Sequence, residues 1–484
     1  MIHQYKLNGY NIVVDANSGS VHVVDEVAYD AIAMVDAAFN EAIKSAEGPA
    51  AVFLSDDYAD EIAENLSEKH GISADEAKEL LGDIKGLREA KQLWSDDPYE
   101  DVAQDLKIKQ SVLKAICLHV AHGCNMDCEY CFAGKGEYSG KSGIMSLEVG
   151  KRALDYLVEN SGSRRHLEVD FFGGEPLLNW DVCKELVAYG RELEKKHDKI
   201  FNFTLTTNGV LIDDDVIDFT NREMGNVVLS MDGRRATHDR MRHTKTGGGT
   251  YDRIMDNFRA LVKSRTDETE ERRSREYYMR GTYTAYNKDF AADVMEMADQ
   301  GFRETSIEPV VADPSAPYAL HEEDIPELCS QYEKLALEMI RRRRAGEPFN
   351  FYHYTVDLTG GPCIYKRVSG CGVATEYLAV TPTGDLYPCH QFVGDDHMKV
   401  GDIYNGITHP EIVEIFSGKN NLYTRDECRN CWAKLYCAGG CAANNYHSNG
   451  DINKVYKMGC ALHKKRIECA LMMAAAEADD AAAE

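Results

Sequence analysis

Hydrophobic and polar residues alternate along the middle of the chain in a pattern that predicts strands separated by helices. Short β-rich runs recur six times, and helical stretches such as 148–159 lie between them. Six β/α units in succession imply an α/β fold, a partial (β/α)6 TIM-like barrel whose C-terminal strand ends bind ligands. The predicted strands are 116–120, 167–172, 201–206, 226–230, 279–284 and 305–308.

A different pattern precedes the barrel. Apolar and polar residues alternate over 12–14 and 21–23 with a turn between them, which predicts a hairpin. Helical spacing follows, most clearly after the capping box Ser-Ala-Asp-Glu at 73–76. We therefore expect residues 1–94 to form a small α+β domain and the polar, acidic stretch 95–111 to be a linker.

The pattern changes again after the barrel core, which we assign to residues 112–330. Residues 355–470 hold nine cysteines and show little periodicity. Ligated metal is therefore expected to replace much of the missing hydrophobic core there. Residues 471–484, rich in Ala and acidic residues, are expected to be a low-complexity tail, a helix that frays into disorder.

Composition narrows the classes of function. The 484 residues are enough for about three domains, and the formal net charge of −27 disfavours nucleic acid as a partner. No apolar run approaches the roughly 20 residues that span a bilayer, and the start lacks the layout of a signal peptide. We expect a cytoplasmic protein with no membrane partner. In that reducing compartment, 15 cysteines indicate metal or redox chemistry rather than disulfides.

Three cysteines follow the first predicted strand of the barrel at CX3CX2C spacing: Cys124, Cys128 and Cys131. A [4Fe–4S] cluster held only by protein takes four cysteines, so three nearby thiolates leave one iron open. With Tyr130 before the third cysteine, the segment resembles the radical S-adenosylmethionine (SAM) family, in which the amino and carboxylate groups of SAM chelate that iron. The alternatives are a zinc site or three buried cysteines.

Further segments resemble the SAM-binding segments of that family and occur in the same order after the next strands. The resemblance implies that the GGEP segment 173–176 holds the methionyl amino group, with glycines that let the backbone approach closely. It also implies that Arg242, with Ser230, pairs with the SAM carboxylate. The implied cofactor contacts are Tyr130, Gly173, Gly174, Glu175, Pro176, Thr206, Asn208, Ser230, Asp232 and Arg242.

Seven later cysteines resemble the SPASM extension of radical SAM enzymes. The resemblance implies two auxiliary [4Fe–4S] clusters, and therefore three clusters in all. Seven cysteines fall one short of eight ligands, which leaves either Cys363 or an open iron for the last position. The implied ligand sets are Cys371, Cys389 and Cys441 for one cluster, and Cys428, Cys431, Cys437 and Cys460 for the other. One or two structural zinc sites are the alternative.

The N-terminal block resembles the precursor-peptide recognition domain of ribosomal peptide maturases, which is winged-helix-like and takes a leader peptide as an added strand. A domain that only stabilises the fold is the alternative. The chain as a whole, from its first 25 residues to the segments 363–367 and 376–382, resembles the SCIFF (six-cysteine peptide) maturases.

That resemblance implies a maturase that joins a Cys sulfur to the α-carbon of Thr, a sactionine-type thioether, in a cysteine-rich ribosomal precursor peptide. A 5′-deoxyadenosyl radical would remove the α-hydrogen, and a reductant such as ferredoxin or flavodoxin would supply electrons. Two alternatives stay open. One is an anaerobic sulfatase-maturing enzyme, which produces formylglycine, and the other is a non-enzymatic iron-sulfur electron-transfer protein.

Overall fold

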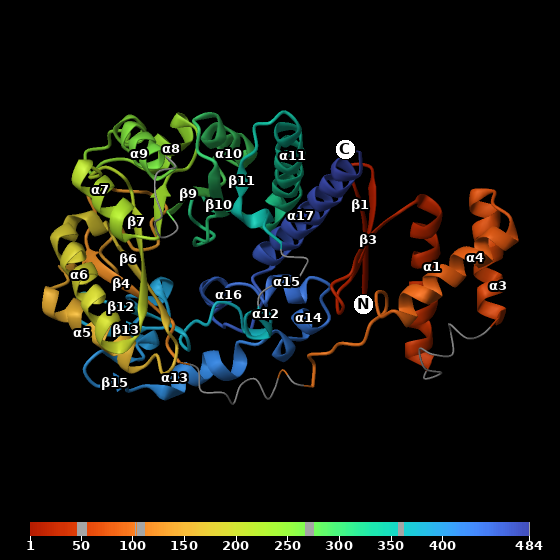
Figure 1. The fold of residues 1–484 in the computed structure, drawn as a ribbon, viewed down its shortest axis with the longest axis horizontal. Coiled ribbons are helices and arrows are strands. Elements are labelled where there is room, and N and C mark those ends of the chain that lie inside the picture. Colours follow the sequence, from red (N-terminus) through yellow and green to blue (C-terminus); the bar gives the residue numbers. More distant parts are fainter. Residues whose placement is uncertain (46–55, 102, 104–111, 267–274, 357–362, 484) are drawn as a thin grey trace.

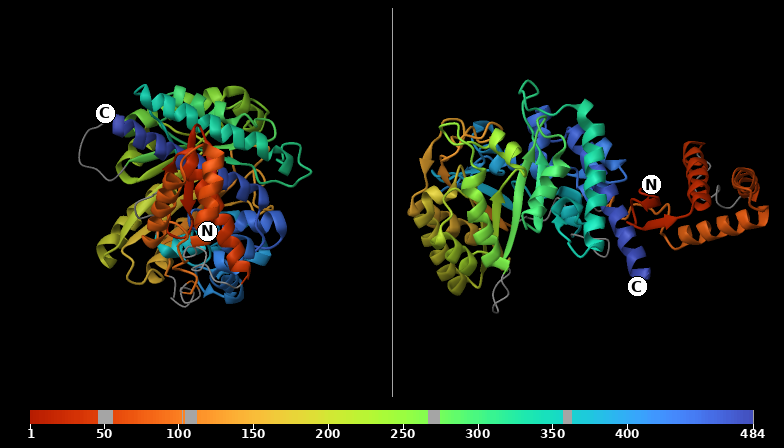
Figure 2. Two further views of the ribbon diagram at one scale, coloured as in Figure 1. Left: turned by 90° about the vertical axis from the view of Figure 1, so that its right-hand side faces the viewer. Right: turned by 90° about the horizontal axis from the view of Figure 1, so that it is seen from above.

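The structure, a computed structural model, separates into parts along its long axis. The N-terminal module lies at one end and the barrel at the other, with the last helix and the C-terminal cysteine-rich part between them (Figures 1 and 2). Much of the predicted linker lies outside the described residues. The described residues are 1–45, 56–101, 103, 112–266, 275–356 and 363–483.

The N-terminal module is an antiparallel sheet followed by helices. Both faces of its second strand are buried, because Val13 packs on the module's own helices while Ile12 and Val14 pack toward the last helix of the chain, α17 (Lys457–Ala483). The predicted hairpin and the capping box that starts α4 are confirmed, whereas the first strand was not predicted. The elements are β1 (Ile2–Leu7), β2 (Tyr10–Asp15), β3 (Val21–Val24), α1 (Glu26–Ser45), α3 (Asp56–His70) and α4 (Ala74–Glu89).

Six parallel strands form the barrel, and each predicted run falls on one of them. Alternate residues such as Val169, Phe171 and Leu205 pack against the outer helices in one continuous core, so the residues between them face the interior. The strands are β4 (Ala115–His122), β6 (His166–Gly173), β7 (Ile200–Thr207), β8 (Asn226–Ser230), β9 (Glu276–Tyr283) and β10 (Glu304–Pro309). The outer helices are α5 (Leu147–Glu159), α6 (Trp180–His197), α7 (Asp214–Glu223), α9 (Tyr251–Thr266), α10 (Phe290–Asp299) and α11 (Ile325–Arg344).

Short strands extend the barrel sheet at both ends. β11 (Asn350–Phe351) pairs with β10, and β12 (Tyr377–Val380), from the cysteine-rich part, pairs in parallel with β4. Among the described residues the sheet runs from β11 to β15 without closing on itself, so the barrel is half-open. The remaining strands are β5 (Gly143–Ile144), β13 (Asp385–Tyr387), β14 (Gly401–Asp402) and β15 (Gly406–Ile407).

The cysteine-rich part consists of short helices and turns, in line with its weak periodicity. Its helices are α12 (Ile364–Ser369), α13 (Pro410–Glu414), α14 (Asp426–Arg429), α15 (Lys434–Cys437) and α16 (Ala442–Asn449). In the part of the chain that the structure covers, no helix has the length and apolar character needed to cross a bilayer.

The expectation of a frayed tail was wrong. α17 continues as a regular helix to Ala483, and Leu471 and Met472 are completely buried. Near its end Asp480 pairs with Arg344 of α11 at 2.9 Å. Composition alone suggested disorder, but packing against the parallel run of α11 gives this Ala-rich segment a partner that composition does not reveal.

Candidate active site at the barrel rim and the cysteine groups

The CX3CX2C loop follows β4 and lies along the segment after α8 (Arg235–Met241). The amide of Asp127 donates to the carbonyl of His243 at 2.8 Å, and that of Glu129 donates to Met241 at 2.9 Å. The three thiols lie within electrostatic reach of one another. Burial raises the pKa of Cys124 to about 11 and of Cys128 to about 12, and nearby thiolates act in the same direction. Iron binding would therefore have to displace protons from these thiols.

Gly173 and Gly174 are required by a backbone crossing beside the cysteine loop. An added Cβ at Gly173 would lie 2.3 Å from the carbonyl oxygen of Ala121, and one at Gly174 would lie 2.1 Å from that of Gly123. Gly173 also has a φ of +129°, which favours glycine. The two glycines therefore let their backbone pass close to the end of β4, which leads into Cys124. The sequence predicted a close backbone approach to a ligand at these glycines.

Glu175 fastens the loops after β6 and β7 together. Its carboxylate accepts hydrogen bonds from Thr207 Oγ1 and from the amide of Asn208, both at 2.8 Å. Burial nevertheless raises the pKa of this carboxyl to about 7. The side chain of Asn208 contacts the cysteine loop, where its Nδ2 lies 3.6 Å from Cys124 Sγ. Pro176 is buried and begins a 3-10 turn directly after Glu175.

Asp232 is completely buried and both of its oxygens have protein partners. The hydroxyl of Tyr130 donates to Oδ2 at 2.6 Å, the amide of Thr282 donates to Oδ1 at 2.9 Å, and Arg242 Nε lies 3.1 Å away. These contacts join Asp232, Arg242 and Tyr130 into one unit beside Cys128. The contacts of Asp232 with SAM and of Arg242 with the SAM carboxylate stay predictions.

Thr206 and Ser230 stand at the C-terminal ends of β7 and β8. Each alternates with a buried core residue, Leu205 and Leu229 respectively, so both side chains face the barrel interior. The sequence-predicted SAM contacts therefore lie on adjoining strand ends and loops around the CX3CX2C loop.

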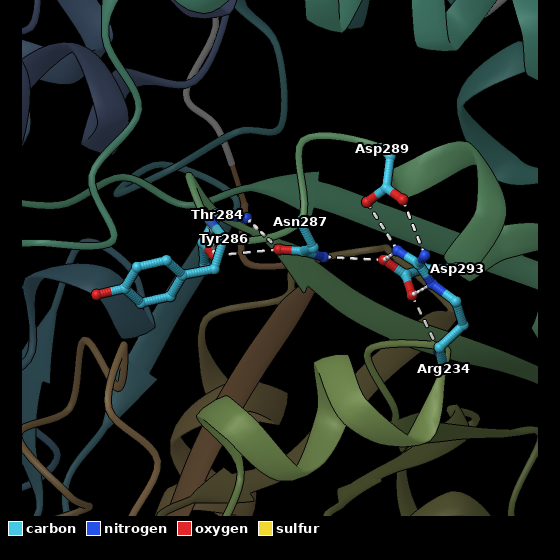
Figure 3. Close-up of polar contacts among 6 residues, drawn as sticks. All are labelled: Arg234, Thr284, Tyr286, Asn287, Asp289 and Asp293. Atoms are coloured by element: carbon cyan, nitrogen blue, oxygen red, sulfur yellow. Dashed lines mark hydrogen bonds and ion pairs between the residues drawn. The ribbon is translucent and has the colours of Figure 1, made fainter.

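An ion-pair network that the sequence did not reveal holds the loop after β8. Figure 3 shows Arg234 between Asp289 and Asp293, with Asn287 linking Asp293 to the turn at Thr284. Arg234 Nε donates to Asp293 at 2.7 Å. Gly233, in the same loop, has a φ of +103°, and an added Cβ would lie 2.3 Å from Asp293. No local motif joins residues this far apart in sequence.

Arg234→Ala is expected to lower the melting temperature and to weaken SAM binding. The change leaves the buried Asp293 carboxylate without its cation, which we expect to cost about 2–3 kcal/mol, below the range for an enclosed pair because Arg234 is 36% exposed. Thermal unfolding and SAM titration measure the effect. Arg235→Ala is the matched control, since its pair with Asp252 is exposed. If the two variants behave equally, the Arg234 network does not hold the loop after β8 in the position that SAM binding requires.

The later cysteines form two further groups. Burial is the main cause that raises the pKa of Cys389, and the charges of Cys441 and Cys371 add to it, so these three thiols are neighbours. The same reasoning joins the second group, in which burial raises the pKa of Cys437 to about 12. That group consists of Cys428, Cys431, Cys437 and Cys460.

Cys363 and Cys371 flank α12. Cys363 directly precedes the helix, and Cys371 follows Gly370 at its other end, so six helical residues of about 9 Å in length lie between them. Ile364, next to Cys363, packs in the same small cluster as Leu435. The assignment of Cys363 as the fourth ligand beside Cys371, Cys389 and Cys441 stays a prediction, with an open iron as its alternative.

Comparison with known proteins identifies the domains. Residues 118–308 match the Radical SAM superfamily, and residues 371–432 match SPASM, an iron-sulfur cluster-binding domain. The chain therefore carries a radical SAM domain and a SPASM domain, and it is an enzyme of the radical SAM class. Such domains bind [4Fe–4S] clusters, one with SAM and others auxiliary, which confirms the predicted cofactors at that level.

Two curated proteins illustrate the relationship. The radical SAM cyclopropyl synthase TigE of Paramaledivibacter caminithermalis is 22% identical over 385 residues, 73% of this chain and 72% of that protein. A cysteine-type anaerobic sulfatase-maturating enzyme of Clostridium novyi is 25% identical over 343 residues, 66% of this chain and 85% of that protein.

A solved structure shares the fold. Native anSMEcpe with bound AdoMet and the Kp18Cys peptide superimposes with a TM-score of 0.61 at 21% identity, covering 75% of this chain and 99% of that chain. This likeness confirms the predicted partial α/β barrel, and the SPASM match confirms the C-terminal SPASM domain.

Proposed function

We propose that this enzyme forms thioether crosslinks in a cysteine-rich ribosomal precursor peptide. Each crosslink joins a Cys sulfur to the α-carbon of an acceptor residue, and we propose Thr as that acceptor. The observation that carries the proposal is the combination of a SAM-type cysteine loop and two further thiol groups with an N-terminal module attached beside them. When bound, SAM and the clusters supply hydrogen abstraction and an electron acceptor, which together remove two hydrogens for each crosslink.

We assign the ligands from the observed thiol groups. Cys124, Cys128 and Cys131 would hold the SAM-binding cluster, and the group with Cys428 would hold a fully ligated auxiliary cluster. The group of Cys371, Cys389 and Cys441 supplies three thiols, and either Cys363 or an open iron would complete that cluster. An open iron suits a thiol substrate, because ligation to a metal deprotonates a thiol.

The N-terminal module has a sheet edge suited to a leader peptide. β3 ends the sheet among the described residues, and Val23 on it is 50% exposed. An extended peptide can add to such an edge through main-chain hydrogen bonds. The opposite edge strand, β1, lies against α17, because the hydroxyl of Tyr5 donates to the carbonyl of Glu468 on that helix at 2.9 Å.

The module is also anchored close to an auxiliary thiol group. The ring of His3 stacks on Trp432 with centroids 3.8 Å apart, and Trp432 directly follows Cys431. A leader held at β3 would therefore be tethered near the cysteine-rich part, which raises the local concentration of the attached core peptide.

Mass spectrometry of a candidate precursor tests the proposal. The candidate is the cysteine-rich peptide encoded nearest to the gene for this chain, incubated without oxygen with the reconstituted enzyme, SAM and a reductant. We expect the loss of two hydrogens per crosslink, resistance to thiol reduction, and no reaction after prior thiol alkylation. An unmodified peptide beside abundant 5′-deoxyadenosine would keep the radical chemistry and discard this substrate.

Formation of formylglycine is the second candidate, favoured by the sulfatase-maturating relative. The match covers 85% of that protein but only 66% of this chain. About a third of this chain is therefore unmatched, which is enough for an added module. Incubation with a cysteine-containing sulfatase peptide distinguishes the two functions. An aldehyde trapped by a hydrazide probe would favour formylglycine over a thioether.

A further inference from the structure

Two charged residues on neighbouring strands face the barrel interior. Met279 of β9 and Ile307 of β10 are buried on the helix side, so Arg280 and Glu308, which follow them, point inward. Arg280 lies in register with Ser230 of β8 on one side and Ser306 of β10 on the other. It therefore stands at the same level as the rim where the SAM contacts gather.

Glu308 is shared by two arginines. Arg280 Nη1 lies 3.5 Å from Glu308 Oε1 and donates to Ser306 Oγ at 2.9 Å. From α17, Arg466 Nη2 donates to Glu308 Oε2 at 2.9 Å. Burial alone would raise the pKa of Glu308, but the charge of Arg466 and its neighbours outweighs burial and lowers it, so the carboxyl is ionised.

The neighbouring histidines do not alter this charge balance. Burial and the charge of Arg466 lower the pKa of His353 to about 3 and that of His463 to about 4, so both rings are neutral. Two arginines facing one carboxylate leave one positive charge in excess. Arg466 is 7% exposed and Arg280 is 42% exposed, so the accessible part of that charge belongs to Arg280.

Arg280 lies between the SAM rim and an auxiliary thiol group. Its carbonyl accepts from the amide of Met231, one residue after Ser230, at 2.9 Å. On the other side its charge reaches His390, which directly follows Cys389, and the charge of Glu308 reaches Cys441. Arg280 is thus near both the predicted SAM contacts and the thiol group of Cys371, Cys389 and Cys441.

We propose that Arg280 binds the main-chain carbonyl of the acceptor residue in the substrate peptide; this rests on the proposed function. Within the described residues its contacts use Nη1, which leaves Nε and Nη2 side by side for a ligand oxygen. A peptide offers a main-chain carbonyl at every residue, whatever its side chains. If Arg280 holds that carbonyl in place, the α-hydrogen of the same residue is oriented toward the strand ends where the predicted SAM contacts lie.

Arg280→Gln in the full-length, cluster-loaded enzyme tests the assignment with the same candidate precursor. We expect crosslinks per 5′-deoxyadenosine to fall by about tenfold to a hundredfold, the size of one charged hydrogen bond. The affinity of a fluorescein-labelled leaderless core peptide, measured by anisotropy, should fall in parallel. Affinities for SAM and for the leader peptide, and the iron content, should stay at wild-type values.

Two further variants sharpen the test. Arg280→Lys keeps the charge without the planar fork and should recover only part of the crosslinking. Arg303→Gln is the matched control and should behave as wild type. Arg303 is exposed near the start of β10, and its side chain donates only to the carbonyl of Pro348 among the hydrogen bonds of the described residues, at 3.0 Å.

Each contrary outcome overturns the assignment in a recognisable way. If Arg280→Gln crosslinks the peptide as well as an active wild type does, the role assigned to Arg280 is rejected and the proposed function stands. Lower SAM affinity would make Arg280 a SAM ligand instead, and lost iron would make its role structural. If the wild type itself leaves the peptide uncrosslinked, the proposed function falls and this assignment falls with it.

Discussion

Replacing Cys124, Cys128 and Cys131 together with Ala is expected to reduce SAM cleavage to background. These thiols form one group on the loop after β4, and three thiolates are needed to leave a single iron of a [4Fe–4S] cluster open for SAM. The auxiliary thiol groups lie on other elements, so their iron should remain. Iron analysis, electron paramagnetic resonance and 5′-deoxyadenosine formation measure the outcome together.

A control separates this effect from general damage. Cys329 on α11 is partly buried and belongs to none of the three thiol groups, so Cys329→Ala should retain full SAM cleavage. Persistent 5′-deoxyadenosine production by the triple variant would show that another site binds SAM. Loss of all iron would show instead that the three groups do not load independently.

Gly174→Ala should disable the same site without removing any ligand. The new Cβ would lie 2.1 Å from the carbonyl oxygen of Gly123 and 2.5 Å from its carbon, and a backbone cannot move aside as a flexible side chain can. Overpacking of this kind costs about 1–3 kcal/mol, and here the displaced peptide leads directly into Cys124. We expect SAM affinity to fall by at least about tenfold, as measured by titration, with less iron in the SAM-binding cluster.

Gly123→Ala is the matched control on the other side of the same contact. Gly123 has nothing within 4 Å of an added Cβ and does not have a positive φ, so the substitution should be tolerated. If Gly123→Ala and Gly174→Ala weaken SAM binding equally, the crossing of the two backbones is not what positions the loop. Normal SAM binding in Gly174→Ala would contradict the prediction directly.

The sequence predicted those features that depend on short spacing. Alternation placed all six barrel strands, because neighbouring residues of a strand always face opposite sides of a sheet. The capping box at Ser73 predicted the start of α4, because its hydrogen bonds join residues three apart. The CX3CX2C loop is equally local.

The sequence does not reveal which distant elements contact one another. The oxygens of Asp232 accept hydrogen bonds from Tyr130, 102 residues away, and from Thr282, 50 residues away. The tail after Cys469 was expected to fray, yet α11 holds it in a helix. Neither partner can be recognised from the residues that surround Asp232 or the tail.

The sequence by itself thus determined the order of the strands, the chemistry of the cysteine motifs and the class of cofactor. Only the tertiary structure decided which distant thiols meet, how the N-terminal module is joined to α17, and that Arg280 and Glu308 share the barrel interior. The physical reason is that residues far apart in sequence are brought together by strand register and helix packing. Those depend on the shape of the whole core, whereas motifs depend on the fixed geometry of a few consecutive residues.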